Sequence, residues 1–439
     1  MKISGRSETS TIGNLFVSNM RTRFTGLFKV HSWEAWAWFF IWFSLPLSIR
    51  LNSLAIVFGG LVMLVSYIRK PHPLNGKRVL HFVLPFLFFG AYSIGAFQNV
   101  TLLTAMKGLE KMGSFIVIPV LFLLSSTNKK AFTQSSLTGL VLSLLMTGTV
   151  MLVFSFWQFL HSWDLSSFTY HQLISPFDSG AIYFSLFLLT ALFQINDVEW
   201  LSGKIAWKRA IIVFFLLLLL LAASKILIGI GIPLLIWNYR RELHLSVKNQ
   251  KTALLLILLL AFLALIPFTQ RLKTLLHPHL EQVSAIQYQY DSPLNGLNLR
   301  LIQWRFGLEI LNESNDWITG VGIHEAQKKL NQKYVQYGLY TGYEGTSDTG
   351  YLNYNFHNQY IETLVRSGII GLMILLTMFV RLFFLPKSTL FAVKWIIFIC
   401  FVFFLTESAL ERQLGIVYFC LIYSSYFHGQ IKHHISDET

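Results

Sequence analysis

Apolar residues in this chain come in long blocks separated by short polar turns. Three examples are Ile211–Ala223, Thr252–Ile266 and Ile369–Val380, each bounded by Lys, Arg or turn residues. A bilayer core about 30 Å thick requires about 20 mainly apolar residues in a helix that crosses it. The pattern therefore predicts an all-α polytopic membrane protein with about twelve transmembrane helices. The expected spans are residues 33–49, 51–68, 79–97, 101–124, 135–160, 178–195, 209–223, 225–238, 252–269, 358–380, 388–406 and 411–428.

One apolar stretch, from Ile211 to Trp237, can be read as one helix or as two. Ser224 and Lys225 interrupt it, and a charged residue inside a membrane helix is costly. A single span there would also reverse the orientation of every helix that follows. We therefore expect two helices.

The lysines and arginines indicate how the helices are oriented. If the N-terminus lies in the cytoplasm, the segments on the same side hold 22 of the 35 basic residues. This is the positive-inside bias of inserted helical proteins, and it predicts cytoplasmic tails at 1–32 and 429–439. It also explains the net charge of +14 without nucleic acid, because nucleic-acid binders concentrate their basic residues on one soluble face.

A long polar segment, residues 270–356, separates the predicted helices at 33–269 from those at 357–428. It holds 7 basic and 8 acidic residues and is rich in Tyr, Trp, Leu and Ile. It is too long for a simple connector and too aromatic for a disordered one. We expect it to fold as an extracytoplasmic domain.

Two short helices are predicted inside this domain. Apolar residues recur at spacings of 3 or 4 within 297–312, which is typical of an amphipathic helix. Residues 325–334 predict a second helix, after a tight turn at Gly320-Val321-Gly322. The Gly- and Tyr-rich stretch from Tyr337 to Tyr354 predicts irregular structure.

The composition excludes a soluble chain, since 54% of the residues are hydrophobic and only 13% are charged. The two cysteines, Cys400 and Cys420, fall inside apolar spans and are expected to be small buried hydrophobic residues. The sequence contains no phosphate-binding loop, no dinucleotide fingerprint, no His-Glu-x-x-His zinc-binding motif and no Asp-x-Asp pair. We therefore expect no metal and no nucleotide cofactor.

The strongest local cluster of polar residues opens the tenth predicted span. Asn358, Glu362 and Arg366 follow one another at spacings of four, which places them on one helix face, and Glu362 and Arg366 are in the favourable order for an ion pair. His357 precedes them. Either His357 and Asn358 are catalytic, or Asn358 simply caps the helix and His357 lies at the membrane interface.

Further candidate residues fall on the same predicted side of the membrane. Arg300 and Trp304 lie one turn apart on the helix at 297–312, where an arginine could grip phosphate with two hydrogen bonds or simply be solvated. Lys225 interrupts an apolar run at a membrane edge, where snorkelling is the simpler explanation. Glu411 and Arg412 precede the last predicted span.

Together these residues resemble the O-antigen ligase and polymerase superfamily of bacterial membrane proteins. The first resembling block is Arg300-x3-Trp304 followed by Gly320-Val321-Gly322. The second is the His-Asn element at 357–358, which leads into Gly-Ile-Ile-Gly at 368–371, a run that would otherwise indicate close helix packing. The third is the acidic turn from Glu407 to Gly415. The family commonly has Ser-Arg where this chain has Ser224-Lys225, and lysine keeps the charge without the planar fork of arginine.

The resemblance implies a GT-C-like fold in the bacterial inner membrane with its active site facing the periplasm. The implied reaction moves a glycan from an undecaprenyl diphosphate carrier to a sugar hydroxyl of lipid A–core, with inversion at the anomeric carbon. Arg300 and Lys225 would bind the diphosphate and His357 would serve as the base. The supporting residues would be Asn358, Trp304, Glu362, Arg366, Glu411 and Arg412.

Two alternatives remain at this stage. A polymerase would use the same donor and extend another lipid-linked repeat instead of lipid A–core. A transporter or flippase of lipid-linked glycans would usually show paired halves and helices broken near the midplane. Lys107, Glu110 and Lys111, inside the fourth predicted span, are the residues most suggestive of a translocation path. We expect membrane lipids as neighbours and, by default, a monomer.

Overall fold

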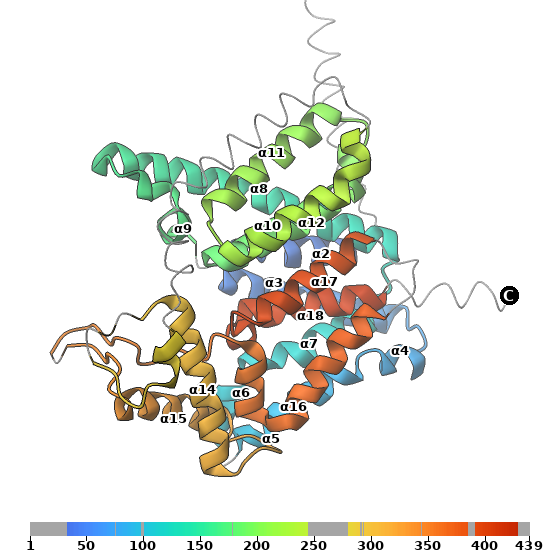
Figure 1. The fold of residues 1–439 in the computed structure, drawn as a ribbon. Helices are drawn as coiled ribbons and strands as arrows, with labels where there is room; N and C mark the ends of the chain where they lie inside the picture. Colours follow the sequence, from blue (N-terminus) through green and yellow to red (C-terminus); the bar gives the residue numbers. More distant parts are fainter. Residues whose placement is uncertain are drawn as a thin grey trace, which may run out of the picture.

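Helices form every regular element among the residues that the structure describes. The computed structural model describes residues 33–74, 76–97, 101–177, 179–244, 280–289, 292, 294–343, 345–384 and 391–428. The prediction of an all-α chain is confirmed there (Figure 1). The α-helices are α2 (Trp33–Ser44), α3 (Ile49–Arg69), α4 (Gly76–Leu80), α5 (Val83–Ala96), α6 (Leu102–Leu109), α7 (Ser114–Leu124), α8 (Lys129–Ser162), α9 (Tyr170–Ile174), α10 (Ala181–Gln194), α11 (Ile205–Leu221), α12 (Lys225–His244), α14 (Gly296–Ser314), α15 (Ile323–Gln336), α16 (Gln359–Phe383), α17 (Phe391–Phe404) and α18 (Gln413–His428).

Three of the described helices are long and apolar enough to cross a membrane, namely α3, α8 and α16. Shorter apolar helices cover 83–96, 111–124, 181–197, 225–239 and 393–404. These helices are typical of an integral membrane protein and coincide with predicted spans. The predicted span at 252–269 and the two tails lie outside the described residues, so the twelve-span topology remains a prediction.

The structure separates α11 from α12, as the interruption at Ser224 and Lys225 predicts. Helix α11 ends at Leu221, Ala223 has a left-handed backbone with φ of 50°, and α12 begins at Lys225. The prediction of one span over 101–124 is wrong. The chain forms α6, a short 3-10 helix η1 (Lys111–Gly113), and then α7. Lys107 and Glu110 are exposed on the α6 side of this break, and only Lys111 is partly buried.

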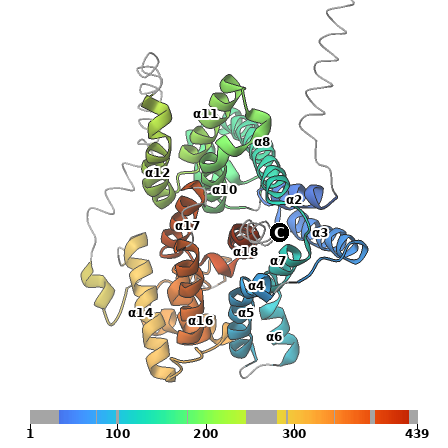
Figure 2. The same ribbon diagram turned by 90° about the vertical axis from the view of Figure 1, so that its right-hand side faces the viewer.

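The two helices predicted in the 270–356 segment are confirmed as α14 and α15, which pack together and against α16. Figure 2 shows α14 alongside α16. Apolar side chains from all three helices share one small core, which includes Ile302, Phe306, Ile310, Ala326, Leu330, Tyr334 and Val365. Lys333 of α15 reinforces this contact by reaching Glu309 at 3.1 Å and Glu313 at 2.5 Å on α14. Burial lowers the pKa of Lys333, but the hydrogen bonds to Glu313 and Glu309 outweigh it, so the pKa is raised.

A break within α16 attaches α14 and α15 to the apolar bundle. Gly368 has φ of 66° and ψ of −168°, a conformation essentially restricted to glycine. At this break the 317–322 segment pairs with α16 through its backbone. Val321 N donates to Val365 O at 2.8 Å, and Ile369 N donates to Trp317 O at 2.9 Å. The run at 368–371 is therefore a docking site for the Gly320-Val321-Gly322 turn, and Gly368 is not the helix-packing glycine that the sequence suggests.

We expect Gly368→Ala to destabilise the protein. An added Cβ would lie 2.1 Å from Ile318 O, and the backbone conformation alone disfavours alanine by about 1–3 kcal/mol. Thermal unfolding of the detergent-solubilised protein measures this. Gly90→Ala in α5 is the matched control, because its added Cβ would meet nothing within 4 Å. Equal unfolding temperatures for the two variants would show that the break at Gly368 is not needed for the stability of the fold.

Candidate functional site

The candidate residues meet where the chain enters α16. Asn358 caps this helix, since its Oδ1 accepts hydrogen bonds from Tyr360 N at 2.9 Å and Ile361 N at 3.1 Å. His357 just before it has a left-handed backbone, with φ of 46°. That conformation costs a non-glycine residue about 1–2 kcal/mol. Asn355 Oδ1 supports it by accepting from His357 N at 3.0 Å. Asn358 is therefore the N-cap of α16, as one of the two interpretations of the sequence predicts. The same capped turn holds His357 in its left-handed backbone conformation.

His357 faces Glu407, which follows α17. The Nδ1 atom of the imidazole lies 3.5 Å from Oε2 of Glu407, an ionic contact when the ring is protonated. The Glu407 side chain is 11% exposed, whereas that of His357 is 27% exposed. The edge of the Tyr354 ring packs on the imidazole, with 5.9 Å between ring centroids. One side of the imidazole is thus held by protein while part of the ring stays accessible.

Glu362 and Ser408 join the start of α16 to the turn that carries Glu407. Ser408 Oγ donates to Glu362 Oε2 at 2.9 Å and accepts from Asn358 N at 3.2 Å. The same carboxylate oxygen accepts from Phe356 N at 3.2 Å. Glu362 is fully buried, so these hydrogen bonds satisfy a charge that has no access to water. They also fix both residues that flank His357.

Arg366 lies at the centre of a buried set of charges, which we name the charged network: Lys111, Glu362, Arg366 and Glu411. The Nε atom of Arg366 donates to Glu362 Oε1 at 2.5 Å, which is the expected ion pair one turn apart. Its NH2 group lies 2.8 Å from Glu411 Oε2. Lys111 reaches the same Glu411 oxygen at 3.0 Å. Two cations therefore offset two carboxylates.

Helix α14 reaches this site through Trp304. Its indole Nε1 donates to Phe356 O at 3.1 Å, one residue before His357. Arg300 lies one turn earlier on α14 and is partly buried. Its NH1 group donates to Gly296 O at 3.3 Å within the same helix. The loop helix thus contacts the histidine segment directly, and Arg300 lies on that helix without an acidic partner among the described residues.

Two expected members of the site, Lys225 and Arg412, lie apart from the contacts that His357 makes in the described part of the chain. Lys225 begins α12, which packs on α10 and α17. Arg412 follows the short 3-10 helix η7 (Ala409–Glu411) and is exposed. Within the described part of the chain, the hydrogen bonds, ion pairs and ring contacts of His357 involve neither residue. Arg412 is nevertheless next to Glu411 in the chain.

Four residues that reasoning from sequence did not place in the site belong to it by contact. They are Glu407, Ser408, Lys111 and Gln359, whose Oε1 accepts from Leu410 N at 2.6 Å. Glu407 and Ser408 fall in the acidic turn already noted, and Lys111 is a charge in an apolar region. Those were usable signals, but only the fold shows which partner each one meets.

Residues 209–376 match the family model described as O-antigen ligase. The match includes Lys225, Arg300, Trp304, His357 and Arg366, and it ends before Glu407 and Glu411. No curated protein matches the chain.

We expect Arg366→Leu to destabilise the protein strongly. It would leave Glu362 and Glu411 buried with fewer cations, and breaking a buried ion pair from one side costs about 3–5 kcal/mol. Lys130→Ala is the matched control, since the Lys130–Glu199 pair is solvent-exposed and is worth at most about 1 kcal/mol. Thermal unfolding in detergent compares them. A similarly small decrease of the unfolding temperature in both variants would contradict the importance of the charged network for stability.

Proposed function

We propose that this protein transfers a glycan from undecaprenyl diphosphate to a sugar hydroxyl of lipid A–core, and the match of residues 209–376 to the O-antigen ligase family model supports this. The observation that carries the proposal is the His357–Glu407 pair at the capped start of α16. A partly accessible imidazole beside a buried carboxylate is suited to removing a proton from a hydroxyl group. We place the reaction at the periplasmic face of the bacterial inner membrane.

The proposed step requires neither a nucleotide nor a metal ion. The acceptor oxygen attacks the anomeric carbon of the donor, the bond from that carbon to the diphosphate breaks, and the diphosphate leaves with the bonding electrons. His357 Nε2 takes the proton of the acceptor hydroxyl. Glu407, whose Oε2 lies 3.5 Å from Nδ1, would stabilise the resulting imidazolium through its negative charge. Attack opposite the leaving group inverts the anomeric centre.

The leaving diphosphate needs fixed positive charge. Arg300 is suited to this because its guanidinium can bind two phosphate oxygens and no described carboxylate competes for it. Lys225 is proposed as a second cation and Arg412 as a supporting one. Arg366 is not available for this role, since Glu362 and Glu411 already bind it. We therefore assign Arg366, Glu362, Glu411, Asn358 and Trp304 to positioning His357.

We expect His357→Ala to lower the rate of transfer about 10²- to 10⁴-fold, the range typical of a lost general base. The assay uses purified protein with lipid-linked donor and lipid A–core acceptor, and it measures the glycoconjugate formed. Glu407→Gln should lower kcat by a smaller factor, because the base remains but its imidazolium is less stabilised. Full activity in His357→Ala would rule out the assigned base.

We expect Arg300→Ala to abolish transfer while membrane insertion stays intact. Arg300→Lys should recover only part of the activity, because lysine supplies the charge without the two-pronged geometry. Membrane fractionation provides the control for insertion. If Arg300→Lys were as active as the original chain, bidentate phosphate binding would be excluded at this position.

A strain that lacks this protein distinguishes a ligase from a polymerase. We expect long lipid-linked polymer that is not attached to lipid A–core, which is the result of a missing ligase. Core bearing a single repeat would instead indicate a polymerase. A new covalent glycoconjugate made by the purified protein would exclude a pure transporter.

A further inference from the structure

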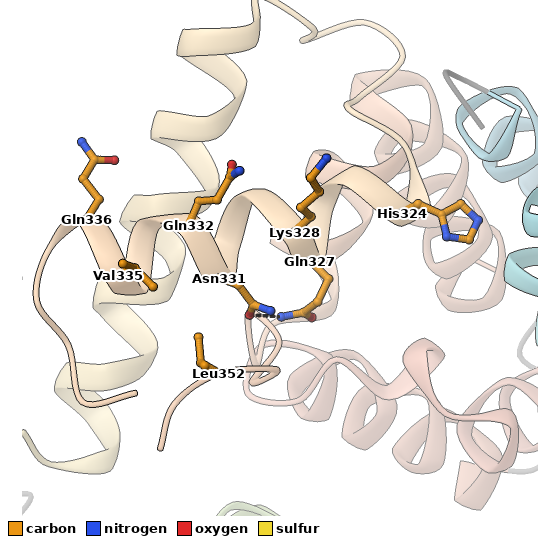
Figure 3. A pocket seen from close by; sticks show the side chains of 8 residues that line it. All are labelled: His324, Gln327, Lys328, Asn331, Gln332, Val335, Gln336 and Leu352. Atoms are coloured by element: carbon orange, nitrogen blue, oxygen red, sulfur yellow. Dashed lines mark hydrogen bonds between the residues drawn. The ribbon is translucent and has the colours of Figure 1, made fainter. Parts of the chain in front are cut away.

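A hollow of about 750 Å³ lies along the outer side of α15, away from the core that this helix shares with α14 (Figure 3). Four amide side chains line it, those of Gln327, Asn331, Gln332 and Gln336, together with the apolar side chains of Val335 and Leu352. Figure 3 shows Val335 and Leu352 pointing toward each other, and Gln332 and Gln336 projecting in the same direction, away from Leu352, from successive turns of α15. None of the residues assigned to the site at α16 lines this hollow.

Leu352 is the residue of the chain segment before His357 that lines the hollow, and two amides of the lining bond the residues that follow it. Gln327 Nε2 donates to Tyr354 O at 3.0 Å, and Asn331 Oδ1 accepts from Asn353 N at 3.0 Å. Tyr354 in turn packs its ring edge on the imidazole of His357. The amides on α15 therefore hold the segment that ends at the proposed base, and the hollow opens beside it.

The other end of the hollow reaches the apolar bundle. His324 lines it and packs so closely on α6 that a Cβ added to Gly108 would lie 2.7 Å from His324 Nε2. From His324 to Gln336 the helix rises about 18 Å at about 1.5 Å per residue. The hollow is thus long enough for several linked sugars and too extended for a single small molecule.

The lining suits hydroxyl-rich ligands. An amide side chain both donates and accepts hydrogen bonds, as a sugar hydroxyl does. Gln332 and Gln336 are exposed, and no described residue binds their amides. Val335 is 63% exposed and offers an apolar surface for the C–H face of a sugar ring. Among the described residues that line the hollow none is acidic, and Lys328 and His324 supply the ionisable groups, so an anionic glycan is not repelled.

We propose that this hollow binds the glycan of the acceptor, and the proposal rests on the function proposed above. Gln327, which lines the hollow, bonds the backbone of Tyr354, and the Tyr354 ring packs on the imidazole that would take the proton of the acceptor hydroxyl. The cations proposed for the donor diphosphate lie on α14 and α12 instead. A glycan that is held along α15 therefore presents its reactive hydroxyl to the base while the carrier approaches from the bundle.

The test measures binding and transfer with the same full-length protein in detergent. The binding probe is the core oligosaccharide freed of lipid A, followed by calorimetry. We expect the double variant Gln332→Ala/Gln336→Ala to raise Kd for this probe, and KM for the lipid A–core acceptor, about tenfold, as for two lost hydrogen bonds. Both kcat and KM for the lipid-linked donor should stay unchanged. Val335→Arg, which places a long side chain in the hollow, should have a larger effect on the same two constants.

Asn312→Ala is the matched control, since Asn312 is an exposed amide on α14 that does not line the hollow. Unchanged acceptor Kd and KM in both hollow variants would overturn the proposal, as would the absence of oligosaccharide binding by the original chain. Binding that depends on Gln332 and Gln336, with no glycoconjugate made by the original chain, would instead overturn the proposed transfer reaction and leave the glycan site standing.

Discussion

The guanidinium of Arg366, held between Glu362 and Glu411, is the interaction on which the candidate site depends. All three side chains are inaccessible or nearly so, and charges in such a place are stable only when each is paired. The second oxygen of Glu362 extends the network to Ser408 and to the backbone before His357. Lys111 extends it to the segment between α6 and α7. Three separate stretches of chain are thereby joined at one point.

This arrangement separates the charges that organise the site from the groups available to a substrate. Arg366 is bound by two carboxylates and both oxygens of Glu362 accept hydrogen bonds within the protein, whereas His357 keeps part of its ring accessible. The break at Gly368 adds a second fixed point, because it lets the backbone of the 317–322 segment pair with α16. Helices α14 and α15 are consequently anchored on both sides of Arg366. The position of α14 and α15 relative to His357 is therefore set by their attachment to α16.

Much of this could be predicted from sequence where the signal is local. Helix positions followed from apolar blocks and from spacings of 3 or 4, and the Glu362–Arg366 pair followed from a spacing of one turn. Contacts between distant segments could not be predicted in this way. Glu407 lies 50 residues after His357, and Lys111 lies 300 residues before Glu411. Gly368 was misread because a glycine that packs helices and a glycine with positive φ look the same in sequence.

In the proposed reaction a single displacement occurs at the donor. His357 removes the proton of the acceptor hydroxyl, and no carboxylate attacks the sugar. Buried Glu362 and Glu411 are bound to Arg366, and Glu407 faces the imidazole, so none of them is placed to form a glycosyl intermediate. The most direct test is the anomeric configuration of the new linkage, determined by NMR on the product of the purified protein and compared with that of the donor. We expect inversion of the anomeric configuration. Retention of configuration would require a covalent intermediate or a second displacement and would contradict the proposed reaction.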